Sequence, residues 1–407
     1  MRTIQIVNVR WFNATAWYGL YLAKLLQNSG NETLVVTLPN TANWQKAKDF
    51  GFDPIFLPFN SKNPLTAPQA YSSLRRLVKQ FKPDIINCHR GEGFVWCALL
   101  RQQLKNFALV RTRGDQRLPK SNLPNLFLHK HALDAVIATN SRMANHFKQK
   151  MGIAPHLVHT ILGGVDSKRF CFNAEARAKV RAEFGFTDSS YVIGLLGRYD
   201  DVKGQLDLIR ATALLRAQLA NLAHAPGPSA ALLPSGASGS PASSASSASS
   251  GILAYPDIRL LFIGHPTPHF PQSRLEACAQ QEGIAEFVHF TGQRDDVPAC
   301  ISALDAGVVA SLWSEAIARA ALEIMACGRP LISTTVGVMP DLLPAEAMYE
   351  PGDWQALAAK LAILIKQEDF AQRLLLDTST RMPGLTKQSF LNSTLQVYNT
   401  ALANLNA

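Results

Sequence analysis

Short apolar runs alternate with amphipathic helical patterns along this chain, and the alternation begins twice. Residues 4–9, 33–38 and 85–88 are apolar runs in the first half, with helical patterns between them. The rhythm restarts at residues 191–196 and continues to 330–334. Strands and helices in strict alternation predict a parallel sheet with helices on both faces. The sequence therefore predicts an α/β chain with two Rossmann-like domains.

The remaining predicted elements follow the same rhythm. Further strands are expected at residues 55–57, 135–139, 156–161, 259–263, 288–291 and 305–310. Helices are expected near residues 17–29, 44–50, 67–81, 206–222, from about 317, and 387–405.

We expect a first domain over residues 1–175 and a second over residues 185–384, joined near 172–190. A last helical segment, 385–407, follows Pro383-Gly384. Residues 226–251 are almost entirely Ala, Ser, Gly and Pro. Such a composition cannot bury enough apolar surface to offset the entropy of ordering, so we expect a disordered, passive insertion in a surface loop.

Length and composition exclude several classes of protein. The 407 residues suffice for two domains with cores of their own. The sequence has no run of about 18 apolar residues, and it begins directly with a strand pattern instead of a signal peptide. We therefore expect a cytoplasmic protein. The six cysteines form no CxxC pair, which favours buried thiols over disulfides or a metal site.

Charge is distributed unevenly along the chain. Residues 1–180 contain 25 Lys and Arg against 9 Asp and Glu, whereas residues 181–407 contain 15 against 21. A cationic first half can face nucleic acid, an anionic membrane or a phosphorylated acceptor. No helix-turn-helix, RNA-recognition or zinc-finger signature accompanies the charge, so we expect no nucleic-acid partner.

Two carboxylates lie eight residues apart, Glu315 and Glu323, where a predicted strand gives way to a predicted helix that Gly328 and Pro330 end. The free N–H groups at the start of that helix can bind a diphosphate. In a continuous helix the two carboxylates would lie roughly 12 Å apart. That separation is too long for a glycosidase acid and base. It suits the two ends of a sugar nucleotide.

These residues resemble the donor site of the retaining glycosyltransferases of family 4, which have the two-domain GT-B fold. The similarity rests on Glu-x7-Glu followed by Met-Ala-Cys-Gly-x-Pro, and on Gly197-Arg198 followed by Lys203-Gly204. Residues 83–89 match a Pro-Asp-x-x-x-x-His motif, and residues 164–166 match Gly-Val-Asp. The resemblance covers most of the chain. It implies two Rossmann-like domains that face each other across a cleft, with the last helix crossing back to the first domain.

The resemblance also implies site residues. Catalytic roles would belong to His89, Arg198, Lys203 and Glu315. Residues expected to bind the donor are Asn13, Ala14, Gly197, Arg294, Ile317, Ala318, Arg319 and Glu323. An anionic acceptor would meet a rim formed by Arg90, Arg111 and Arg113. Two cations at a strand end can neutralise a departing diphosphate, so no metal and no cofactor are expected.

The sequence departs from the family pattern at three places. Asn13-Ala14 replaces a common Gly-Gly pair, so close approach of the backbone to phosphate is less favoured. Ala316 and Ala318 replace common glycines beside the first glutamate. Residues 336–341 lack the frequent Gly-Gly-x-x-Glu pattern. These changes affect the identity of the sugar more than the type of reaction.

The expected function is transfer of a sugar, with retention, from a nucleotide diphosphate sugar to a hydroxyl of a cell-envelope glycan such as lipopolysaccharide core. The acceptor would be lipid-linked or a polysaccharide, and the enzyme would be peripheral on the inner face of the cytoplasmic membrane. Alternatives are a glycosyltransferase with a soluble acceptor and a non-catalytic GT-B scaffold that binds sugar nucleotides. A dinucleotide oxidoreductase is disfavoured, because no G-x-G-x-x-G follows either first strand. The donor sugar, base, acceptor and oligomeric state are left open.

Overall fold

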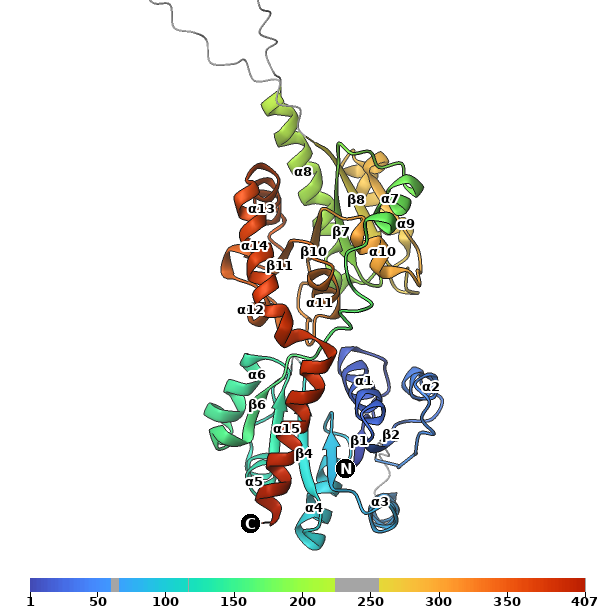
Figure 1. Ribbon diagram of the computed structural model, residues 1–407, viewed down its shortest axis with the longest axis vertical. Coiled ribbons are helices and arrows are strands. Elements are labelled where there is room, and N and C mark those ends of the chain that lie inside the picture. The colour runs from blue at the N-terminus through green and yellow to red at the C-terminus, as the bar shows by residue number, and fades with distance from the viewer. Residues whose placement is uncertain (60–65, 116, 224–255, 407) are drawn as a thin grey trace, which may run out of the picture.

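The computed structural model confirms two α/β units, each built on a six-stranded parallel sheet (Figure 1). It describes residues 1–59, 66–115, 117–223 and 256–406. The predicted insertion at 226–251 lies outside the described residues. The first sheet has the order β2-β1-β3-β4-β5-β6 and the second the order β12-β11-β10-β7-β8-β9.

The strands of the first sheet are β1 (Arg2–Ile6), β2 (Glu32–Val36), β3 (Ile85–Cys88), β4 (Ala108–Arg113), β5 (Ala135–Ala138) and β6 (Val158–Thr160). Its helices are α1 (Ala14–Asn28), α2 (Ala42–Asp49), α3 (Ala67–Phe81), α4 (Phe94–Leu104), α5 (Leu123–His131) and α6 (Ser141–Asn145).

The strands of the second sheet are β7 (Ser190–Leu196), β8 (Asp257–Ile263), β9 (Val288–Phe290), β10 (Ala306–Val309), β11 (Leu331–Thr334) and β12 (Met348–Tyr349). The helices that follow α6 in the chain are α7 (Ala174–Glu183), α8 (Gln205–Ala223), α9 (Gln272–Gln281), α10 (Val297–Ser302), α11 (Arg319–Ala326), α12 (Met339–Leu342), α13 (Trp354–Lys366), α14 (Glu368–Arg381) and α15 (Lys387–Asn406).

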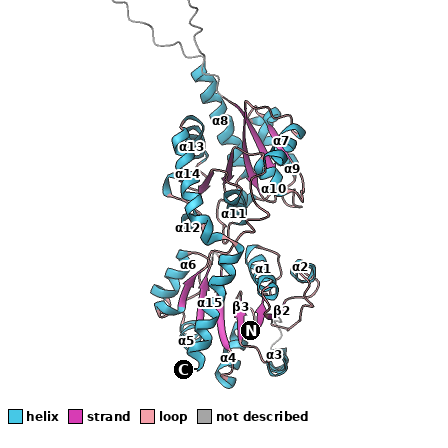
Figure 2. Cartoon of the chain, in the orientation of Figure 1, coloured by secondary structure: helices cyan, strands magenta, loops and turns pink. Residues whose placement is uncertain are grey.

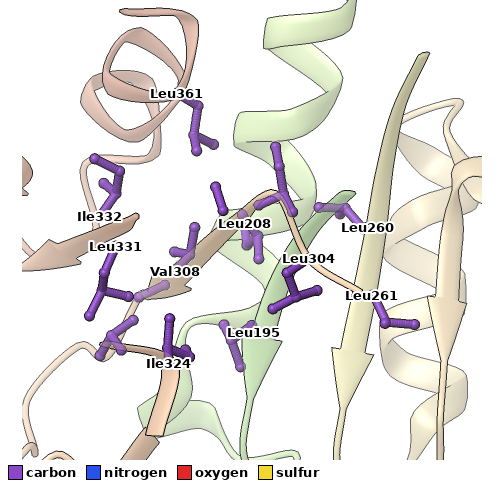
Figure 3. Close-up of a cluster of buried hydrophobic side chains, with 14 of the residues drawn as sticks. Leu195, Leu208, Leu260, Leu261, Leu304, Val308, Ile324, Leu331, Ile332 and Leu361 are labelled. Atoms are coloured by element: carbon purple, nitrogen blue, oxygen red, sulfur yellow. The ribbon is translucent and has the colours of Figure 1, made fainter. Parts of the chain in front are cut away.

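Helices cover both faces of each sheet, as Figure 2 shows. In the second unit, Leu208 of α8 and Leu361 of α13 pack against the strands, and Ile324 of α11 also belongs to this core (Figure 3). All three side chains are fully buried. This burial explains the apolar runs without polar alternation, because strands covered on both faces have no solvated side.

Three predicted elements differ from the observed ones. Residues 55–57 were expected to form a strand, but only Ile55 forms a bridge, to Val36. The segment expected to join the domains contains α7, which packs on α10 of the second unit. The helix expected from about residue 317 begins at Arg319, because Ala318 has left-handed backbone angles.

Helix α15 leaves the second unit and lies along the first (Figure 1). Its Phe390 ring packs 4.6 Å from that of Tyr18 on α1. Farther along, the buried Tyr398 hydroxyl accepts a hydrogen bond from Asn87 Nδ2 at 2.8 Å and donates to Gln5 Oε1 at 3.4 Å. The polar side chains of two neighbouring strands, β1 and β3, are therefore satisfied by a residue 393 and 311 positions away.

Tyr398→Phe is expected to lower the free energy of unfolding by about 1–3 kcal/mol, because the Asn87 and Gln5 amides would stay buried without this partner. Chemical denaturation measures the change. Tyr71→Phe is the matched control, since the Tyr71 hydroxyl bonds Gln103 at an exposed position. Equal stability of the Tyr398 variant and the wild type would contradict the prediction.

Ala318 carries the cost of a backbone conformation that favours glycine, with φ of 46° and ψ of 51°. Ala318→Gly relieves this strain, and the relief offsets the loss of a buried methyl group. We expect a nearly unchanged midpoint of denaturation. Ala321→Gly, inside α11 and fully buried, is the control and should cost about 2 kcal/mol. Equal losses in both variants would show that Ala318 is unstrained.

Candidate active site

A cavity of about 610 Å³ lies between the two units. The second unit contributes the carboxyl ends of β7 and β8, the loop before α11, and the first turn of α11. The first unit contributes Phe12, Asn13, Ala14 and Trp17 at the start of α1, together with Lys46 of α2. Ligands of open parallel sheets bind at such strand ends.

Glu315 lies in the loop between β10 and α11, and its carboxylate is 7% exposed. Lys203 Nζ and Ser311 Oγ both donate to its Oε1, each at 2.5 Å. The Glu315 carbonyl accepts from Val338 N–H at 2.8 Å. A Cβ at Gly337 would approach that carbonyl oxygen to 1.9 Å, so only glycine fits behind Glu315. The loop is therefore fixed on both sides.

Lys203 ends a 3-10 turn, Asp201–Lys203, that follows β7. The next residue, Gly204, has φ of 66°, and a Cβ there would lie 2.0 Å from the Ala310 carbonyl oxygen. This close approach brings Lys203 beside the end of β10, where it reaches Glu315. Glycine follows Lys203 in the sequence because a side chain at that position would clash with the Ala310 carbonyl.

Arg198 also lines the cavity, and its side chain is half-exposed. Its Nε donates to Asp200 at 2.9 Å, and its carbonyl accepts from Gln205. A Cβ at Gly264 would lie 2.0 Å from the Gly197 carbonyl, so the ends of β7 and β8 approach closely here. The exposed guanidinium can turn from Asp200 to a ligand.

Helix α11 points its N-terminus into the cavity at Ala318, Arg319 and Ala320. Ala318 provides no side-chain cap, and the first N–H groups of a helix have no partner within it. Arg319 Nη2 donates to Glu323 Oε1 at 3.0 Å. Burial raises the pKa of Glu323, and the Arg319 guanidinium opposes that shift.

On the first unit, Asn13 caps α1 by accepting from Ala16 N–H at 3.0 Å. One turn later the Trp17 ring lies under the Arg319 guanidinium, with 4.5 Å between them. A second cavity of about 350 Å³ adjoins the first and shares Trp17, Arg319 and Glu323 with it. Its other walls include the rings of Tyr21 and Phe50.

Basic side chains outnumber acidic ones around the larger cavity. Six line it, namely Lys46, Arg169, Arg198, Lys203, Arg294 and Arg319. Two carboxylates, Glu315 and Glu323, face them. The arrangement favours an anionic ligand, with two carboxylates left for hydroxyl groups.

The structure brings most of the predicted donor residues to this cavity. Those that line it are Asn13, Ala14, Gly197, Arg198, Lys203, Arg294, Glu315, Ala318, Arg319 and Glu323. Arg294 is held by Glu183 at 2.6 Å and by Asp296 at 2.7 Å. Ile317 lies elsewhere, since its side chain is fully buried in the cluster around Tyr18 and Phe390.

His89 does not line the cavity. Its ring is 1% exposed, and its Nε2 lies 2.9 Å from Gln5 Oε1. A Cβ at Gly19 would come within 2.9 Å of the ring, so α1 packs directly on it. Burial lowers the pKa of His89 to about 3, which keeps the imidazole neutral. A role for His89 beside the transferred sugar stays a prediction.

The predicted rim arginines pair within the first unit. Arg113 Nη2 lies 3.2 Å from Asp115, and Arg90 Nε lies 3.6 Å from the same carboxylate. Arg111 is 4% exposed, its guanidinium stacks 4.0 Å above the Phe94 ring, and burial lowers its pKa to about 9. None of the three lines the larger cavity. A role in acceptor binding stays a prediction.

Several residues that line the larger cavity were not predicted from the sequence. Arg169 and Phe170 follow Gly-Val-Asp by three residues, and Trp17 lies one turn beyond Asn13. Lys46 comes from α2, where no motif marked it. Their spacing from a turn motif or along a helix could have indicated Arg169, Phe170 and Trp17. Lys46 could be found only from the fold.

The described part of the chain holds no group of three or more His, Cys, Asp or Glu side chains placed to bind a metal ion. Over the same residues, no helix combines the length and apolar character needed to cross a membrane.

Curated relatives match this chain at low identity, among them two glycosyltransferases. D-inositol 3-phosphate glycosyltransferase of Salinispora tropica is 27% identical over 61% of this chain and 46% of its own length. The lipopolysaccharide core biosynthesis mannosyltransferase LpsB of Rhizobium meliloti is 28% identical over 60% of this chain and 56% of its own. The chain thus spans about half the length of the curated relatives it matches.

Solved structures extend the likeness over the whole fold. A glycosyltransferase from Rickettsia africae ESF-5 superposes with a TM-score of 0.79, at 17% identity and 99% coverage of both chains. Anabaena HepE in complex with UDP-glucose gives 0.71 at 18% identity, over 99% of this chain and 100% of the other. These likenesses show the GT-B fold.

Two family models match separate halves of the chain. Glycosyltransferase Family 4 matches residues 16–169, and Glycosyl transferases group 1 matches residues 246–367. The first match includes α1 from its third residue onward, and the second includes the Glu315 loop and α11. With the GT-B architecture and the Glu315–Lys203 site between its units, this chain belongs to the group 1, family 4 glycosyltransferases.

Proposed function

We propose that this protein is a retaining, metal-independent glycosyltransferase that uses a nucleotide diphosphate sugar as its donor. The observation that carries the proposal is the inter-domain cavity with six basic side chains against two carboxylates. A diphosphate matches the cations and the α11 N-terminus, and the carboxylates match sugar and ribose hydroxyls. The UDP-glucose bound by Anabaena HepE is a ligand of this class.

The donor would extend along the start of α11. Arg198, Lys203 and the N–H groups beyond Ala318 would hold the diphosphate, with Glu323 at the ribose. Before binding, Lys203 is held by Glu315. When the diphosphate takes Lys203, Glu315 Oε1 keeps only the Ser311 hydrogen bond and can accept another from a sugar hydroxyl. Binding the donor would therefore place both groups in their working positions.

The reaction would proceed on one face of the sugar. The acceptor hydroxyl oxygen forms the new bond to the anomeric carbon as the bond from that carbon to the diphosphate breaks. The hydroxyl proton passes to the departing phosphate oxygen. Arg198 and Lys203 stabilise the negative charge that develops on the leaving group, which is the main electrostatic demand of the step.

We propose a cell-envelope glycan such as lipopolysaccharide core as the acceptor, bound by an enzyme on the inner face of the cytoplasmic membrane. The likeness to LpsB supports the glycan, and the cationic first half supports the membrane. A soluble, phosphorylated acceptor is the second candidate. The likeness to D-inositol 3-phosphate glycosyltransferases favours it.

Lys203→Ala and Arg198→Ala are each expected to leave a folded protein and to lower turnover by about 100-fold or more. Each variant removes one cation from the leaving group. Donor consumption is measured with a panel of nucleotide sugars, the best donor being chosen first by thermal stabilisation. Arg373→Ala is the control, because this half-exposed arginine on α14 pairs only loosely with Glu346, at 3.7 Å. Turnover near the wild-type value in either variant would refute the assignment.

The membrane proposal predicts co-sedimentation of the full chain with vesicles that contain anionic lipid, and weaker binding as salt rises. Basic residues contribute about 1 kcal/mol each near such a surface, and the attraction fades over roughly 8 Å at physiological salt. Replacing the exposed Arg75, Arg76 and Lys79 of α3 with Gln should weaken binding. Replacing Lys360 and Arg373 of the second unit should not.

The same experiment separates the two acceptors. If the chain fails to bind anionic vesicles at low salt and is fully active on a soluble phosphorylated acceptor, the second candidate is correct and the membrane proposal falls.

A further inference from the structure

A separate hollow of about 490 Å³ lies behind the turn that carries Lys203, on the second unit alone. It is lined by the first residues of α8, by Phe270 and Arg274 near the start of α9, and by Trp313. Trp313 belongs to the same loop as Glu315, two residues earlier, but the larger cavity does not include it. The loop thus separates two hollows.

Trp313 is 54% exposed and lines the hollow together with the buried Phe270. The loop is anchored next to it, since Leu312 N–H donates to the Val202 carbonyl at 2.8 Å. A large ring on an anchored loop at the edge of a hollow forms a flat apolar wall. Such a wall matches the apolar face of a pyranose ring, whose axial C–H groups lie on one side.

Charged groups in the hollow are paired with one another. Arg274 lies 2.7 Å from Asp201, Arg210 lies 3.6 Å from Asp207, and Asp200 is held by Arg198 from outside. Because these charges are paired, the hollow has no large excess of positive or negative charge that would attract an ionic ligand. They retain spare carboxylate lone pairs and guanidinium N–H groups, which suit a neutral ligand with several hydroxyls.

One further group in the wall lacks a partner. Gln205 is 1% exposed, and its Nε2 donates to the Arg198 carbonyl at 3.0 Å. Among the described residues its Oε1 has no hydrogen-bond partner. A buried amide oxygen without a partner is costly, and a hydroxyl group of a bound ligand can donate to it.

We propose that this hollow is a carbohydrate subsite that binds a neutral pyranose unit of a glycan, with Trp313 as the stacking platform. The inference rests on the proposed function, which supplies a glycan acceptor. It adds a contact on the second unit, behind the donor site. A sugar bound there would lie against the loop that carries Glu315 and the turn that carries Lys203.

The test is direct binding to the full chain, measured by saturation-transfer NMR. The probes are methyl α-D-glucopyranoside, methyl α-D-mannopyranoside, methyl α-D-galactopyranoside and lactose. At least one is expected to bind the wild type, and Trp313→Ala should weaken that binding about tenfold or more, since loss of an aromatic anchor is costly. Trp313→Phe retains a ring and should keep most of the binding.

Phe127→Ala is the matched control, because this ring is 64% exposed on α5 of the first unit. A circular dichroism spectrum and a cooperative thermal transition like those of the wild type verify that Trp313→Ala is folded. Should it not fold, Asp207→Asn removes a charged acceptor from the hollow and should weaken glycoside binding severalfold. Absence of binding by every probe, or binding that these variants leave unchanged, overturns the subsite.

The outcome is distinguishable from that of the proposed function. Donor binding and donor consumption depend on Arg198 and Lys203 and are measured without glycoside. If the chain consumes nucleotide sugars but Trp313 substitutions leave glycoside binding unchanged, the proposed function stands and the subsite is refuted.

Discussion

Much of the relative placement of the two sheets depends on the junction where the chain crosses twice between the units. The chain passes from the first unit to the second near Val165 and returns at Thr386, and the two passages bond to each other there. Val165 N–H donates to the Leu385 carbonyl at 2.9 Å, and Lys387 N–H donates to the Val165 carbonyl at 2.8 Å. Asp166 adds an ion pair with Lys387 at 2.7 Å. A Cβ at Gly164 would lie 2.5 Å from the Thr386 carbonyl, so the contact needs glycine. The walls of the cavity come from both units. The junction therefore helps to fix the distance between those walls.

Much of the fold was predictable from residue patterns. Helix α3 and strand β3 have the bounds that periodicity gave, because each has a strong pattern and clear ends. The start of α11 was not predictable to the residue. Ala318 has a high helix propensity, yet the loop places it in a left-handed conformation. There the tertiary position of Glu315, held by Lys203 and by Val338 N–H, outweighs the local preference.

The residues of the candidate site also fall into those that the sequence could predict and those that it could not. Residues with a motif at a strand end, such as Arg198, Lys203 and Glu315, reach the cavity because the carboxyl ends of parallel strands converge. His89 also ends a strand, but Gly19 lets α1 close over it. Lys46 lines the cavity from α2, where no motif marks it, because the direction of its side chain depends on packing between elements that sequence spacing does not reveal.

The ion pairs around the larger cavity give it counterions of its own. Lys203 has Glu315, Arg319 has Glu323, Arg198 has Asp200, and Arg294 has Glu183 and Asp296. The diphosphate of the proposed donor would exchange places with these carboxylates, whereas in an unpaired site it would displace dissolved ions. Each released carboxylate stays nearby as a fixed negative charge, so its repulsion offsets part of the attraction between the diphosphate and the cations. The affinity for the proposed donor should therefore respond to ionic strength less steeply than six unpaired cations would suggest, because few dissolved ions are released when it binds.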